Sequence, residues 1–158
     1  MKHYVLNKES QWGGFPATDL FILGATRAAA GASDFTDADT SQTFTLMTPA
    51  AGDIVTYPLA QAYTKAAFVG TDLTAVTLDV GFAGGEEFVK DGAMFAANAG
   101  AASVLCSQSG GPKVFDGATT LSAKVDTTGA NLSAITAGEL WIFVCLTRIT
   151  DQLLNRTA

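Results

Sequence analysis

The sequence has little of the chemistry that most enzymes use. Its 158 residues include one histidine and two cysteines, and only 15% of them are charged, against about 25% in an average globular protein. The single histidine, His3, has no Ser or Cys motif near it, so we do not expect it to serve as the base of a catalytic triad. The composition favours a non-enzymatic protein that uses no cofactor.

Positive charge is also scarce. The chain carries 9 Lys and Arg against 15 Asp and Glu, for a formal net charge of −6. Nucleic-acid binding depends largely on a clustered basic surface, which nine scattered positive charges cannot supply. We therefore expect no nucleic-acid partner.

Long apolar runs are absent as well. The run 140–146 is far shorter than the roughly 20 residues that cross a bilayer. Residues 1–10 contain no apolar stretch of the kind that a secretory signal needs. We expect a soluble protein with no membrane contact, made in the cytoplasm. Cys106 and Cys145 lie far apart without a neighbouring Cys or His, and we expect both to be buried as small hydrophobic residues, a disulfide being the alternative.

The sequence is rich in segments in which apolar and polar residues alternate with a period of two. In residues 75–82, Val76, Leu78, Val80 and Phe82 share one face of a predicted strand, and residues 121–126 alternate in the same way. Further strands are predicted at 43–48, 54–57 and 62–69, and Pro49 and Pro58 are expected to close two of them. Only residues 88–99 suit a short helical turn.

Turn residues separate these strands by about 10–15 positions, a spacing typical of an antiparallel β-sandwich or jelly roll of about eight strands. The predicted fold is therefore all-β. Residues 1–19 are interpreted as an irregular, extended N-terminal arm, 20–150 as the sandwich domain and 151–158 as a C-terminal tail.

Two segments, 19–26 and 139–148, are apolar on both faces. A sandwich buries one face of each sheet, so the second apolar face needs cover from an arm, a loop or a neighbouring subunit. Trp141 and Phe143 either face a neighbour, or form the core row while Leu140, Ile142 and Val144 are covered by the arm. We favour the first arrangement and hence self-association.

Aromatic residues of the expected arm also indicate contact with a neighbour. Trp12 and Phe15 stand beside Gly13, Gly14 and Pro16, in a segment that orders most easily against another surface. We interpret them, together with Tyr4, as anchors for a protein neighbour. A sugar-stacking role is the alternative.

One acidic segment is a weak candidate for a metal site. Asp34, Asp37 and Asp39 fall within six residues, and clustered carboxylates can bind Ca²⁺. The downstream glycine and bidentate glutamate of an EF-hand loop are missing. A solvated loop that uses Asp as a turn residue is the favoured interpretation, with no bound metal.

Three tracts resemble a class of small virion structural proteins of tailed bacteriophages. They are TDLTAVTLDVGF at 71–82, NAGAASV at 98–104 and DTTGANLSAITAGELWIFV at 126–144. In the last tract the residues that match the class pattern are Thr128, Gly129, Asn131, Leu132, Ser133, Thr136, Ala137, Gly138 and Glu139, while Ile135 stands where Leu is usual.

The resemblance implies a capsid decoration (cement) protein. Such a protein would be a homotrimeric β-sandwich on the capsid surface of the virion, binding the major capsid protein and stabilising the head by bridging its subunits. The alternatives are a tail or head-fibre module that binds a glycan or receptor, and a tail-tube or connector subunit. The resemblance brings no catalytic residues.

Overall fold

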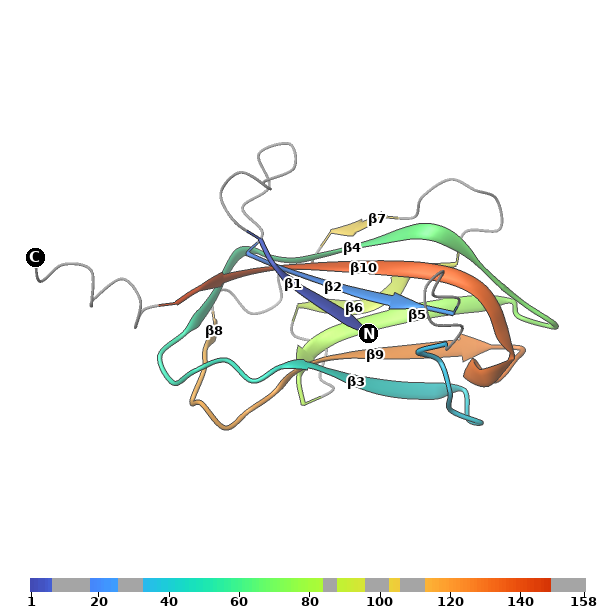
Figure 1. The fold of residues 1–158 in the computed structure, drawn as a ribbon, viewed down its shortest axis with the longest axis horizontal. Coiled ribbons are helices and arrows are strands. Elements are labelled where there is room, and N and C mark those ends of the chain that lie inside the picture. The colour runs from blue at the N-terminus through green and yellow to red at the C-terminus, as the bar shows by residue number, and fades with distance from the viewer. Residues whose placement is uncertain (7–17, 26–32, 84–87, 96–102, 106–112, 149–158) are drawn as a thin grey trace, which may run out of the picture.

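The computed structural model describes residues 1–6, 18–25, 33–83, 88–95, 103–105 and 113–148 of the chain. These residues form two antiparallel sheets that pack face to face (Figure 1), which confirms the predicted all-β sandwich. Sheet A has the strand order β1-β2-β10-β4-β7, with β8 also paired to β4, and sheet B has the order β3-β9-β5-β6.

The strand bounds are β1 Lys2–Val5, β2 Asp19–Gly24, β3 Ser41–Met47, β4 Ile54–Gly70, β5 Ala75–Phe82, β6 Val89–Ala93, β7 Ser103–Leu105, β8 Lys113–Val114, β9 Leu121–Thr128 and β10 Ile135–Thr147. In the described part of the chain the only helical element is the 3₁₀ turn η2, Leu132–Ala134. No helix in that part is long and apolar enough to cross a membrane.

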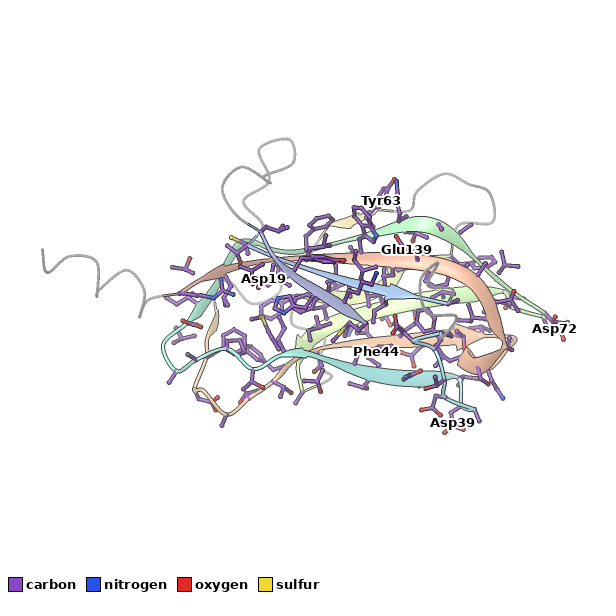
Figure 2. All side chains as sticks on the ribbon, in the orientation of Figure 1. Asp19, Asp39, Phe44, Tyr63, Asp72 and Glu139 are labelled. Atoms are coloured by element: carbon purple, nitrogen blue, oxygen red, sulfur yellow. The ribbon has the colours of Figure 1, made fainter. Side chains whose placement is uncertain are left out.

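The core lies between the two sheets. Ile142 of sheet A and Leu78 of sheet B are both fully buried. Phe35, in the connection before β3, makes edge contacts with Phe44 of sheet B and Phe68 of sheet A, at ring-centroid distances of 5.8 and 5.7 Å. Phe35 therefore contacts both sheets. Its partner in sheet B, Phe44, is labelled in Figure 2.

The strongest alternating patterns fold as predicted. β5 spans Ala75–Phe82, and β9 begins at Leu121. The predicted break at Pro58 is wrong, because β4 runs unbroken from Ile54 to Gly70. The pairing with β10 passes from Ala60 opposite Val144 to Val55 opposite Leu146, so the register shifts around Pro58. Proline lacks an N–H for the ladder, and such an irregularity accommodates it inside a strand.

The predicted helical turn within 88–99 is also wrong for its described residues. Val89–Ala93 forms β6, which pairs with β5 at the edge of sheet B. Asp91 adopts a positive φ of 46°, and its N–H donates to the Asp79 carboxylate at 2.6 Å. Pairing with an open sheet edge outweighs the weak local helical preference.

The start of the expected irregular arm is instead a strand. β1 pairs antiparallel with β2, and the Leu6 N–H extends this ladder by donating to the Thr18 carbonyl. Residues 7–17, which include Trp12 and Phe15, lie outside the described residues, as do Cys106 and the expected tail at 151–158.

Candidate association surface on sheet A

The side chains of β10 alternate between the core and the outer side of sheet A. Leu140, Ile142 and Val144 are buried in the core, at 0–1% exposure. Trp141 and Phe143 point to the opposite side and are half-buried. The structure therefore decides between the two arrangements expected from the sequence: the aliphatic residues form the core row, and the two aromatic residues face outward.

Neighbouring strands extend the outward aromatic pair into a continuous patch. Residues directly opposite each other in an antiparallel ladder share a face. Two rows cross the strands in this way, Tyr4, Leu20 and Phe143 in one, and Ile22, Trp141 and Tyr63 in the other. We call these six residues the outer patch; Tyr63 is labelled on β4 in Figure 2.

The indole of Trp141 is fixed by three contacts. Its Nε1–H donates to Glu139 Oε1 at 2.6 Å. The Lys65 ammonium lies 5.7 Å from the ring centroid, within the range of a cation–π contact. The Phe143 ring packs edge-on, with centroids 6.2 Å apart and planes inclined by 64°. A side chain held in this way loses little conformational entropy when a partner covers it.

The outer face of sheet B has the opposite character. One cross-strand row holds Thr43, Lys124 and Asp79, and another holds Thr45 and Ser122. Thr43 and Thr45 are exposed, Lys124 is half-buried, and Asp79 and Ser122 are buried. Lys124 Nζ also forms an ion pair with Asp126 at 2.8 Å. The sandwich is therefore two-sided, with an apolar, aromatic outer face on sheet A and a polar outer face on sheet B.

Sequence reasoning found half of the outer patch. Trp141 and Phe143, proposed as interface residues, are brought together with their rings in contact, whereas Trp12 and Phe15 lie outside the described residues. Tyr4, also expected to be an anchor, lies in the same patch, whereas Tyr63, Leu20 and Ile22 were not singled out. Their common face depends on which strands pair and in which register, and a single sequence carries no direct signal of that.

The acidic segment is held in place by hydrogen bonds to backbone N–H groups. Asp34 Oδ2 accepts from the Gly24 N–H at 2.9 Å, and Asp37 Oδ1 accepts from the Asp39 N–H at 3.2 Å. The main-chain carbonyls of Asp37 and Asp39 accept from the N–H groups of Ser133 and Leu132. Among the described residues, no three His, Cys, Asp or Glu side chains converge as a metal site.

His3 contacts the buried carboxylate of Asp19 in a partly exposed polar cluster on the core side of sheet A. Its Nε2 lies 2.8 Å from Asp19 Oδ1, and its ring stacks on Phe21 with centroids 4.3 Å apart. Asp19 is fully buried and also accepts from the Thr18 hydroxyl and, with both oxygens, from Arg148 Nη2. The cluster joins β1, β2 and the end of β10, and it lies far from Asp39 and Asp72 (Figure 2).

Residues 126–139 contain the turn that joins β9 to β10. Gly129 has a φ of 87°, and a Cβ there would lie 2.0 Å from the Asp72 carbonyl oxygen. Leu132 is fully buried, and the Thr136 hydroxyl donates to the Val69 carbonyl at 3.2 Å. Glu139, which follows Gly138, accepts the hydrogen bond from Trp141. These residues therefore set the turn from β9 into β10 and position the outer patch.

Comparisons with protein-family models, with curated proteins and with solved structures find no match for this chain.

Proposed function

We propose that this chain is a non-enzymatic structural protein of a bacteriophage particle, and specifically a capsid decoration protein on the surface of the virion. In this role it forms a homotrimer, binds the major capsid protein and bridges adjacent capsid subunits. The observation that carries the proposal is the two-sided character of the sandwich. One outer face carries a fixed aromatic cluster suited to protein contact, and the described rows on the other are polar, with Thr43 and Thr45 exposed to water.

The outer patch offers apolar ring surface that a partner could cover. A large aromatic side chain buries about 150–250 Å² when it is fully covered. Covering the remaining area of a half-buried ring such as Trp141 or Phe143 would contribute on the order of 2 kcal/mol at about 25 cal/mol per Å². A protein that binds only the assembled capsid stabilises it by mass action, because its binding free energy is absent from the separated subunits.

A glycan-binding fibre module is the second candidate. Aromatic rings flanked by the Glu139 carboxylate and the Lys65 ammonium are groups that can hold a sugar. The geometry favours a protein partner, since the rings of Trp141 and Phe143 are inclined by 64° and form no flat platform. A glycan array with wild type and Trp141→Ala separates the two: signal that disappears in the variant supports the sugar site.

Quantitative mass spectrometry of purified phage particles tests the leading proposal. We expect a copy number comparable with that of the major capsid protein. Absence from the particle, or only a few copies in each, would rule out the decoration role, and a few copies would favour a tail or connector subunit.

A further inference from the structure

The first strand of sheet A is attached to its neighbour by few side chains. β1 is four residues long, all four side chains are exposed, and Tyr4 and Val5 are 45% and 69% exposed. Among the described strands it pairs with β2 alone. Among the described residues, its side-chain contacts include those of His3 with Phe21 and Asp19, and the Met1 amino group forms an ion pair with Asp34.

The site that receives His3 is built by other strands. Phe21 is fully buried in the core, and the Asp19 carboxylate is held by Thr18 and by Arg148, which follows β10. Neither holding contact depends on β1. The site can therefore accept a His3 side chain from a second copy of the chain as well as from its own.

The connection between β1 and β2 is longer than their pairing requires. Leu6 and Thr18 are already paired across the ladder, and a β-hairpin needs only about 2–5 connecting residues. Residues 7–17 supply eleven. At about 3.3–3.6 Å for each extended residue, such a connection can span on the order of 35 Å, enough to reach an adjacent copy.

We propose that β1 is exchanged between copies, so that Lys2–Val5 of one chain pairs with β2 of its neighbour and inserts His3 against the neighbour's Phe21 and Asp19. Exchange of an identical strand conserves every native contact, so it links copies at little cost. It also brings Tyr4 of one copy into the outer patch of the next, beside Leu20. The inference requires two copies side by side and does not depend on the phage particle.

An engineered disulfide tests the exchange. Lys2 and Ile22 are opposite each other in the ladder, and opposite strand residues lie within the Cα distances that a disulfide spans. Lys2→Cys with Ile22→Cys is placed in a background in which Cys106 and Cys145 are replaced by alanine. A matched control, Thr45→Cys with Ser122→Cys, links β3 to β9, which no exchange of β1 separates.

Light (¹⁴N) and heavy (¹⁵N) protein are mixed while unfolded, refolded together and oxidised. The monomeric and associated fractions are then separated, and mass spectrometry identifies the disulfide links in each. We expect the β1–β2 link within single chains in the monomer, and between heavy and light chains in the associated fraction. The control link should stay within single chains in both fractions. An intrachain β1–β2 link in the associated fraction, an associated fraction without interchain links, or a chain that remains monomeric would each overturn the exchange.

Discussion

The single residue Asp19 connects several strands at one end of the sandwich through its buried carboxylate. It accepts hydrogen bonds from His3, Thr18 and Arg148 while its own side chain has no solvent exposure. A buried carboxylate is tolerated only when its charge is matched and its oxygens are hydrogen-bonded. The cluster therefore stabilises the fold as a unit, and removing any one partner weakens the others.

The first prediction follows from this cluster. Asp19→Asn should lower the free energy of unfolding by about 2 kcal/mol, because it leaves the Arg148 charge without its carboxylate. Urea denaturation measures the change. Asp126→Asn is the matched control, since its ion pair with Lys124 is partly exposed and should be worth less than about 1 kcal/mol. Equal losses in the two variants would contradict the role assigned to the cluster.

Asp116 gives a prediction about pH. The N–H groups of Thr119 and Ala118 and the Thr119 hydroxyl donate to its carboxylate, and these bonds hold the pKa of Asp116 below its ordinary value. A carboxyl whose pKa is lower in the folded state contributes stability above its unfolded pKa of about 4, and this contribution disappears as the pH falls through the folded pKa. The group is fully exposed, so the contribution is small.

The measurement compares urea midpoints of wild type and Asp116→Asn between about pH 3 and pH 7. Wild type should have the higher midpoint at neutral pH, and the gap should narrow as the pH falls. A gap that widens toward acid pH would contradict the assignment.

Among the strands, β10 owes its bend to one glycine, Gly138. β10 bends near its start (Figure 1), where its pairing with β4 shifts register around Ala137 and Glu139. Gly138 has a φ of 136°, and a Cβ there would lie 2.4 Å from the Phe68 ring. Because Phe68 is buried in the core, its ring cannot move aside without disturbing its contact with Phe35.

Gly138→Ala should therefore lower the free energy of unfolding by about 2–4 kcal/mol, the sum of backbone strain and overpacking. Gly52→Ala serves as the control, because Gly52 also has a positive φ, of 88°, but open space around its Cβ position. It should cost only about 1 kcal/mol, from strain alone. If both variants are equally stable by urea denaturation, the contact with Phe68 does not constrain the strand.

The strands also show how much of the fold can be predicted from the sequence alone. Alternation located β5 because Val76, Leu78 and Val80 are buried on one face of a regular strand. It failed at Pro58 and in β6, where pairing with a neighbouring strand decides the conformation. The sequence predicted Trp141, Phe143 and Tyr4 as contact residues but not Tyr63, since the position of Tyr63 beside Trp141 follows from long-range register.

The difference between the two outer faces is the property of the whole molecule that bears on function. The chain has only 15% charged residues. The aromatic outer patch lies on sheet A, whereas the described cross-strand rows on the outer face of sheet B are polar. A fixed aromatic cluster on a protein surface invites contact with a partner. Sheet A is therefore the face on which we place the neighbour.

Self-association should depend on that face. Light scattering of wild type at micromolar concentration should report a multimer, and Trp141→Asp should shift it to the monomer, because the substitution places a charge at the centre of the outer patch. Thr45→Asp, on the outer face of sheet B, is the control and should leave the multimer unchanged. A multimer that survives Trp141→Asp would place the contact elsewhere.

The orientation of the sandwich on the phage particle, seen by cryo-electron microscopy, tests the central claim most directly. The account predicts density for this chain on the capsid surface, with Trp141, Phe143 and Tyr63 against neighbouring subunits and the row of Thr43 and Lys124 facing solvent. A particle in which the outer face of sheet A is bare, while the outer face of sheet B makes the contacts, would contradict it.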